Sequence, residues 1–406
     1  MKRRRIIGSG VAVLLGLACS VQAGIETGAV REWTGTDSIA GDYVGWSAAI
    51  DGDAAAVGAP LADHGGTIGS GAVYVFQRNQ GGTNAWAERR KIVVSSPATN
   101  DQFGWSVALD GDVMAAGARF GDVGSRTNTG FVGVFQRNAG GTNNWGQVAL
   151  LAPSAVTTGD LFGAAVAVDG DVLVAGASAH DVDGTNSAGA VFVFERRSVG
   201  STSAWVEVAQ ILSTDVAPVQ FFGSSVAVDG DVIAVGAPGV NGGVGGKGAV
   251  YLFERNASSG DTWGPVVKLQ PADLPSGQNF GQSVALRNGT LLVGAPGAST
   301  SLVSNTGSAY AFVRTRGGTN AWQQVARLAP SDSSPGQDFG RVVALHGDLA
   351  IIGAPISNVV YAFQRDAGGE EAWGEVARIA APPGVGSLDA FGAGVALGAE
   401  IGRAHV

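Results

Sequence analysis

Short apolar runs separated by glycine-containing turns follow one another along the chain in a constant order. In a representative segment, the apolar run 162–168 leads into Asp169-Gly170, and a second apolar run spans residues 172–177. Two such runs joined by Asp-Gly predict a β-hairpin, because a type I′ turn requires positive φ at both central residues. No stretch shows sustained helical periodicity, so the pattern predicts an all-β chain.

The same turn recurs with small changes. It reads Asp-Gly at residues 51, 110 and 229, Asn288-Gly289 in a later segment, and His346-Gly347 in the next. Asp, Asn and His are the non-glycine residues that best tolerate left-handed φ. The substitutions therefore predict that Asn288 and His346 are turn residues.

Two further strands are predicted in each segment. The run 189–194 is apolar on both faces, which indicates a strand buried on both sides. A fourth strand begins near Trp205 and alternates polar and apolar residues, as expected for an outer strand with one wet face. An arginine follows each third strand, and this regularity predicts a structural pair with a turn carboxylate. These arginines are Arg78, Arg137, Arg196, Arg255, Arg314 and Arg365.

A Phe-Gly pair opens each segment and sets the period of the chain. The units start near residues 43 (degenerate Tyr43-Val44-Gly45), 103, 162, 222, 280, 339 and 391, which gives a spacing of 58–60 residues for all but the last. A fixed period of this kind indicates a repeat architecture. Four antiparallel strands, repeated about seven times, predict a β-propeller over residues 24–406, with seven blades of which the last is incomplete.

The repeated elements resemble a known family. Gly-Ala-Pro follows the second strand at residues 58–60, 236–238, 294–296 and 353–355, and is altered to Gly117-Ala118-Arg119 and Gly176-Ala177-Ser178. Phe-Gly, a valine-rich strand and Gly-Ala-Pro together resemble FG-GAP repeats. The resemblance implies the seven-bladed propeller found in integrin α subunits and in many exported bacterial proteins.

Many FG-GAP repeats carry an Asp-rich calcium loop between the first and second strands. Here that loop reads only Asp-Gly-Asp or similar, whereas a calcium ion takes about six to eight oxygen ligands. The calcium site of the family is therefore not expected at these turns, and no cofactor is predicted.

Residues 1–23 have the composition of a secretory signal. Lys2 and three arginines precede a short apolar run, and Val21-Gln22-Ala23 offers a cleavage site before Gly24. The alternative is lipid attachment at Cys19, the only cysteine of the chain. Either route predicts a secreted, periplasmic or cell-surface protein, and the apolar run is too short to insert the mature chain into a membrane.

The seventh unit departs from the pattern. After Phe391-Gly392 and one apolar run, the second hairpin strand and the Gly-Ala-Pro element are missing before Val406. Residues 28–33 could add an outer strand to this blade. The favoured interpretation is a truncated or frame-shifted form of a longer chain, and a genuinely weak blade is the alternative.

Charge and motifs limit the classes of function. The chain has 25 basic and 34 acidic residues, a net charge of −9, and no basic-aromatic cluster, which disfavours a nucleic-acid partner. No catalytic motif is found: the four histidines have no metal-ligand spacing, and no nucleophile elbow or phosphate loop occurs. Nothing in the sequence indicates an oligomeric state.

The variable connections between second and third strands are the expected place for recognition, because loops on a rigid scaffold commonly carry binding residues. Asp63, His64, Asp181 and Asp183 are the most polar residues there and are the candidate ligand-binding residues. The leading hypothesis is an exported, non-enzymatic recognition or adhesion module for a protein or a glycan. The alternatives are a propeller enzyme acting on extracellular polysaccharide and a structural fragment of a larger surface protein.

Overall fold

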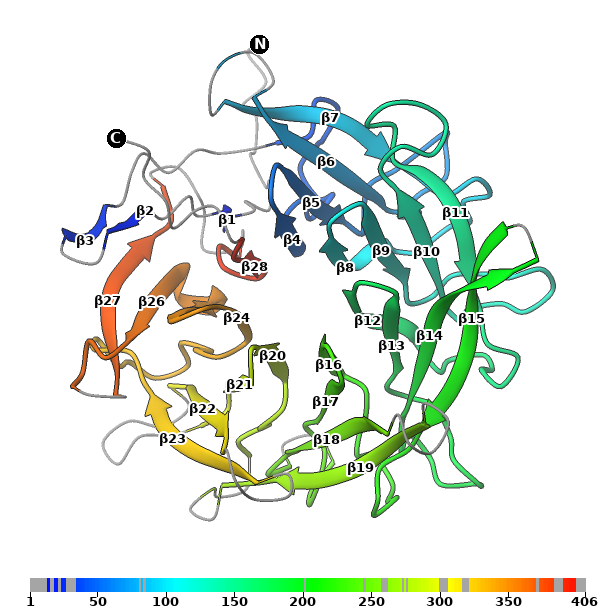
Figure 1. Ribbon diagram of the computed structural model, residues 1–406. Helices are drawn as coiled ribbons and strands as arrows, with labels where there is room; N and C mark the ends of the chain where they lie inside the picture. The colour runs from blue at the N-terminus through cyan, green and yellow to red at the C-terminus, as the bar shows by residue number, and fades with distance from the viewer. Residues whose placement is uncertain are drawn as a thin grey trace, which may run out of the picture.

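Six four-stranded antiparallel sheets surround a central axis in the computed structural model (Figure 1). The structure describes residues 34–398 and the short strands β1 (Val13–Leu14), β2 (Ala18–Ser20) and β3 (Ala23–Glu26). The ranges left out of 34–398 are 80–81, 83–84, 201, 244–245, 257–261, 272–273, 275–276, 299–305, 316–320, 370–371 and 383–389. The prediction of a β-propeller built from four-stranded antiparallel blades is confirmed.

Each blade is a meander of four consecutive strands. The first blade contains β4 (Ser47–Asp51), β5 (Ala54–Ala59), β6 (Ala72–Arg78) and β7 (Trp86–Ile92), and the second contains β8 (Phe103–Asp110), β9 (Val113–Ala118), β10 (Phe131–Gln136) and β11 (Gly146–Leu151). The third contains β12 (Phe162–Asp169), β13 (Val172–Ala177), β14 (Ala190–Val199) and β15 (Thr202–Ile211), and the fourth contains β16 (Ser225–Asp229), β17 (Val232–Ala237), β18 (Ala249–Asn256) and β19 (Thr262–Leu269).

The last two complete blades follow the same order. The fifth contains β20 (Ser283–Arg287), β21 (Thr290–Ala295), β22 (Ser308–Arg314) and β23 (Trp322–Leu328). The sixth contains β24 (Val342–His346), β25 (Leu349–Ala354), β26 (Val359–Arg365) and β27 (Trp373–Ala380), with the 3₁₀ turn η2 (Pro355–Ser357) after β25. The first strand of every blade is innermost in Figure 1, and the fourth is outermost.

The expectation of seven blades is wrong: the described residues form six four-stranded blades. In the described part of the seventh unit, β28 (Val395–Ala396) is the one strand, and it belongs to a two-stranded sheet with β1 rather than to a four-stranded blade. β28 contacts β24 and β4 and thereby closes the inner ring, and it pairs in parallel with β1. The outer strand expected from residues 28–33 lies outside the described residues.

The hairpin turn differs from its prediction by one residue. Asp169 is the last residue of β12 and pairs with Val172, so the central turn residues are Gly170 and Asp171, of which only Gly170 has positive φ, 55°. His346 likewise ends β24 opposite Leu349, and its predicted left-handed role is wrong. Asn288 and Gly289 do both have positive φ, 49° and 71°, as a type I′ turn requires.

The Phe-Gly pair joins neighbouring blades. The Phe222 side chain is fully buried in an apolar cluster shared by the third and fourth blades, where its ring lies edge-on to Tyr251 with centroids 5.5 Å apart. Its backbone N–H donates to the Ala188 carbonyl of the preceding blade at 3.0 Å. Phe103, Phe162, Phe280 and Phe339 make the same backbone bond to the blade before them.

The glycines of the repeat permit a close backbone approach between blades. A Cβ on Gly117 at the end of β9 would lie 1.9 Å from the carbonyl oxygen of Gly163 in the next blade. The Ser106 hydroxyl donates to the same carbonyl at 2.8 Å. Gly163 itself has φ of +82°, which favours glycine. No helix that could cross a membrane occurs among the described residues.

Replacing Gly117 with Ala is expected to lower the free energy of unfolding by about 3 kcal/mol, because the methyl group must push two backbones apart. Urea unfolding measures the effect. Gly264→Ala is the matched control: a Cβ at Gly264 in β19 would meet nothing within 4 Å, so its change should stay within about 0.5 kcal/mol. Equal midpoints for the two variants would contradict the close approach.

Candidate functional site

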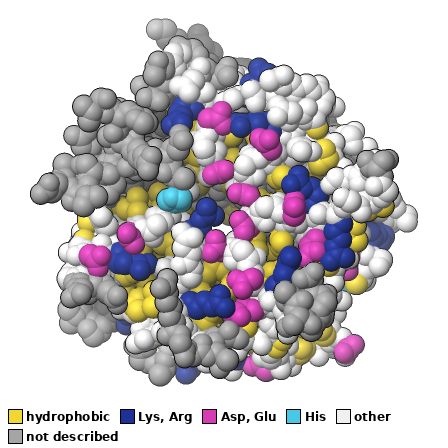
Figure 2. All heavy atoms as spheres, viewed as in Figure 1, with side chains coloured by type: hydrophobic (Ala, Val, Ile, Leu, Met, Phe, Trp, Pro, Cys, Tyr) yellow, Lys and Arg dark blue, Asp and Glu magenta, His cyan; other side chains and the backbone are white. Residues whose placement is uncertain are grey.

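The turns between first and second strands form one side of the ring, here called the turn face. The Asp51 carboxylate accepts the Gly111 N–H of the next blade at 2.8 Å, and Asp110, Asp169 and Asp229 repeat this contact with the following blades. Acidic side chains gather around the centre of the face in Figure 2. These carboxylates accept hydrogen bonds from the next blade, so they link neighbouring blades and have a structural role.

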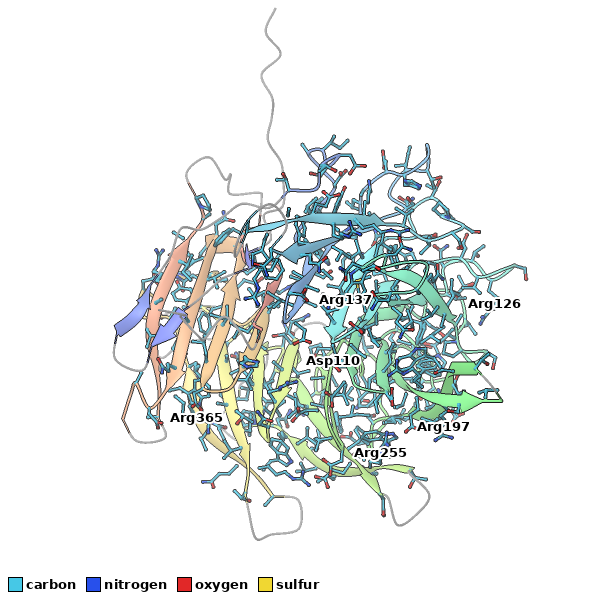
Figure 3. All side chains as sticks on the ribbon, turned by 45° about the horizontal axis from the view of Figure 1, so that its top comes forward. Asp110, Arg126, Arg137, Arg197, Arg255 and Arg365 are labelled. Carbon is cyan, nitrogen blue, oxygen red and sulfur yellow. The ribbon has the colours of Figure 1, made fainter. Side chains whose placement is uncertain are left out.

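The regularly spaced arginines form ion pairs wherever their contacts are described, four of them with a turn carboxylate as predicted and Arg255 with Glu195 on β14. Arg137 pairs with Asp53 of the preceding blade, and Arg196 pairs with Asp171. Arg365 pairs with Asp348 at 3.2 Å, whereas Arg255 reaches Glu195 at 2.6 Å (Figure 3). Arg314 pairs with both Asp231 and Glu254. No group of three or more His, Cys, Asp or Glu arranged to hold a metal occurs in the described part of the chain.

The opposite side of the ring, the loop face, carries the connections between second and third strands. Two of the predicted ligand residues have a structural contact there. Asp63 accepts the Gly69 N–H at 2.8 Å, and Asp181 accepts the Ser187 N–H at 2.8 Å. Asp122 makes the same bond to Asn128 in the intervening blade. This contact is part of the repeat, so it shapes the loop.

The other two predicted residues also belong to the loop geometry. His64 exchanges two backbone hydrogen bonds with Thr67, of 3.1 and 2.9 Å. Asp183 and Gly184 have φ of 48° and 80°, as in a type I′ turn. The side chains of His64 and Asp183 are exposed. The second blade separates the pair at 63–64 from the pair at 181–183, so the structure does not bring the four predicted residues together.

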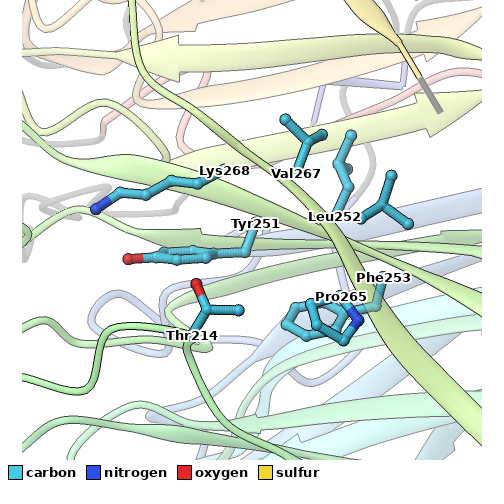
Figure 4. Close-up of a pocket in the computed structure, with 8 residues that line it drawn as sticks. Thr214, Tyr251, Leu252, Phe253, Pro265, Val267 and Lys268 are labelled. Atoms are coloured by element: carbon cyan, nitrogen blue, oxygen red, sulfur yellow. The ribbon is translucent and has the colours of Figure 1, made fainter. Parts of the chain in front are cut away.

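A shallow pocket lies on the fourth blade between β18 and β19, lined by Tyr251, Lys268 and Thr214, among others (Figure 4). The Tyr251 hydroxyl and the Lys268 ammonium both donate to Asp215. Burial, together with this hydrogen bond, raises the pKa of Tyr251 above its usual range. The triad recurs as Tyr74–Lys91–Asp37 and Tyr361–Arg378–Asp332, which identifies it as part of the scaffold.

A different feature of the loop face does not repeat. Five side chains from the first two blades form a continuous contact series, here called the aromatic–arginine row: Tyr43, Trp46, Trp105, Arg119 and Phe120. Ring centroids are 5.9 Å apart for Tyr43–Trp46 and 4.6 Å apart for Trp46–Trp105. The Arg119 guanidinium carbon lies 3.1 Å from the Trp105 ring centroid and 4.6 Å from that of Phe120.

The backbone explains where the row lies. Trp46 immediately precedes β4, and Trp105 lies at the start of β8, so both are at the ends of inner strands opposite the turn face. Arg119 directly follows β9, whose last residue Ala118 pairs with Phe103. Tyr43 has φ of 57° and is 44% exposed, while the other members of the row are half-buried.

Arg119 has an unusual electrostatic environment for this protein. Its Nε donates to Gln102 Oε1 at 2.8 Å, and no carboxylate among the described residues pairs with it. Burial lowers the pKa of Arg119 to about 10, so the group stays cationic at neutral pH. The neighbouring Asp101 is buried, and its two oxygens accept the N–H groups of Ala98 and Asp122.

The row breaks the repeat. The residues equivalent to Trp46 and Trp105 are Ala164, Ser224, Gln282, Arg341 and Ala393 in the other units. Arg119 stands where four units have proline. The altered Gly-Ala-Arg element is visible in the repeat pattern, but neither tryptophan is among the predicted ligand-binding residues. The sequence signal for these tryptophans is Gly-Trp-Ser, which occurs in two units and is replaced in the others. A repeat position whose side chain the scaffold does not constrain can diverge in this way.

Comparisons with known proteins agree with the architecture. A sequence model of the FG-GAP repeat matches residues 30–76, 86–135, 145–194, 205–253, 263–312 and 322–368. No curated protein matches the chain in sequence.

Solved propellers of similar shape are known. A provisionally named 6-phosphogluconolactonase from Bacteroides uniformis superposes with a TM-score of 0.56 at 10% identity, covering 92% of this chain and 98% of that one. A second protein so named, from Bacteroides fragilis, gives 0.53 at 11% identity, with 92% and 96% covered. A protein from Lactobacillus plantarum gives 0.51 at 12% identity, with 81% and 82% covered. At such identities the likeness concerns the fold alone.

The stacking of Arg119 on Trp105 can be measured with a double-mutant cycle of Arg119→Gln and Trp105→Ala. A half-buried cation–π contact predicts a coupling of about 0.5–2 kcal/mol in the free energy of unfolding. Arg119→Gln combined with Trp373→Ala, on the sixth blade, is the control and should be additive. Additivity of both pairs would contradict the contact.

Proposed function

The chain belongs to the FG-GAP repeat family, and we propose that it is a non-enzymatic recognition module whose loop face binds a protein or glycan at the aromatic–arginine row. One observation carries the proposal. Trp46, Trp105 and Arg119 differ from the residues that the later units carry at these positions, and they lie in one contact series with Tyr43 and Phe120.

The composition of the row supports binding. Tryptophan, tyrosine and arginine are the residues that contribute most of the energy at recognition surfaces, because they combine large contact area with few rotatable bonds or a rigid donor fork. The row also rests on a scaffold of buried strands: β5 and β9 are buried along their whole lengths. Side chains on such a support lose little further freedom on binding.

A polysaccharide-cleaving enzyme would need different side chains at this site. Hydrolysis of a polysaccharide commonly needs two carboxyl groups beside the scissile bond. Asp101 adjoins Gln102, the hydrogen-bond partner of Arg119, and both of its oxygens accept backbone N–H groups. Asp122, three residues after Arg119, accepts the Asn128 N–H. The row therefore offers contact area and a cation, which suits binding better than cleavage.

Replacing both tryptophans with the residue that the third unit carries, Trp46→Ala with Trp105→Ala, is expected to weaken ligand binding at least about 10-fold. The assay is a panel of immobilised polysaccharides and extracellular proteins, with product release monitored in parallel. Arg287→Gln on the turn face is the control and should bind normally. Cleavage of any panel member, or unchanged binding by the double variant, would overturn the proposal.

We also propose that the chain is exported, from the basic and apolar composition of residues 1–23. Mass spectrometry of the protein purified from its own cells should show Gly24 as the first residue. A lipid-modified Cys19 at the N-terminus would support surface attachment instead, and a retained Met1 would contradict export.

A further inference from the structure

We propose that the ligand of the loop face is an anionic glycan, carboxylated or sulfated, and that Arg119 determines this specificity by binding the anionic group. The inference rests on the proposed function and adds the chemical class of the ligand.

The fold does not require an arginine at this position. Four other units place proline there, at Pro60, Pro238, Pro296 and Pro355, each directly after a second strand that ends at the residue equivalent to Ala118. The β9 ladder ends at Ala118, and no described hydrogen bond uses the Arg119 backbone N–H. The side chain of Arg119 is therefore an addition to the scaffold.

The guanidinium group is held in place with most of its donors unused. Trp105 and Phe120 contact it, and Nε donates to Gln102. Among the described residues nothing accepts from Nη1 or Nη2, which together carry four N–H groups. A planar fork of this kind matches the two oxygens of a carboxylate or sulfate. The arginines of the third-strand ends pair instead with the protein's own carboxylates, as Arg137 does with Asp53.

The rest of the row favours a sugar over an acidic peptide. Beside Arg119 the row continues through the half-buried rings of Trp105 and Trp46 to Tyr43, whose ring is 44% exposed. Sugar rings expose C–H groups on their faces and hydroxyls at their edges, so they can cover aromatic rings while the hydroxyls keep contact with water. A peptide would bring backbone N–H and C=O groups onto aromatic rings, where they lose hydration without gaining partners.

Calorimetric titration with matched oligosaccharides tests the inference. The probes are an oligogalacturonate, its neutral methyl ester, and a neutral oligosaccharide with and without sulfate groups. We expect the wild-type protein to bind at least one anionic probe about 10- to 100-fold more tightly than its neutral counterpart, the effect of hydrogen bonds to a charged group. The two anionic probes distinguish a carboxylate from a sulfate.

The variants assign the effect to Arg119. Arg119→Pro restores the residue of four other units, so it should fold, and it should remove the preference for the anionic probe. Arg119→Lys keeps the charge without the planar fork and should retain only part of the preference. Arg287→Gln, an equal change of charge on the turn face, should leave it intact. Thermal unfolding of each variant verifies the fold.

The failures are distinguishable. Equal affinity for charged and neutral probes, or a preference that survives in Arg119→Pro, overturns the anionic class while the tryptophan-dependent recognition stands. No binding to any of the four probes also overturns the anionic glycan. The recognition proposal itself is overturned if no ligand of the wider panel depends on Trp46 and Trp105, or if a panel member is cleaved.

Discussion

The close approach of glycine backbones between neighbouring blades is the contact on which the ring depends. Gly117 of one blade faces the Gly163 carbonyl of the next at a distance that admits no Cβ, and Ser106 hydrogen-bonds to the same oxygen. Gly58–Gly104, Gly236–Gly281 and Gly294–Gly340 repeat this approach, each with a serine hydroxyl on the carbonyl. Blade spacing is thus set by backbone atoms, which leaves side chains elsewhere free to vary.

Not every departure from the repeat points to a ligand. His180 replaces the small residues found at the same position in the first two units, Ala62 and Gly121. Its ring is buried, and Nδ1 contacts the Asp160 carboxylate at 2.7 Å. This departure is internally satisfied. Arg119 differs because its guanidinium is half-buried while its terminal nitrogens have no acceptor among the described residues, and such a donor fork matches the oxygens of an anionic group from outside.

Periodicity was enough to predict the four-stranded blades, the outer tryptophan strands and the structural arginines, because each is a local pattern repeated in sequence. The seventh blade was overestimated since a single strand, β28, can close the inner ring through contacts with β24 and β4. The site was misplaced for another reason. Polarity points to Asp63 and Asp181, yet their carboxylates accept backbone N–H groups of their own loops. The Trp105–Arg119 contact depends on how close the start of β8 lies to the end of β9 in space, which the sequence pattern alone does not give.

The overall acidity of the chain gives the proposed site a particular character. A net charge of −9 repels anions at long range, so general electrostatic attraction cannot concentrate an anionic glycan at this surface. Binding must then come from short-range contacts with Arg119 and the aromatic rings. Such an arrangement favours discrimination over speed of association, since an anion that does not engage the guanidinium fork gains no attraction from the net charge of the chain. A preformed cation stacked on Trp105 suits this purpose because little ordering remains to be done on binding.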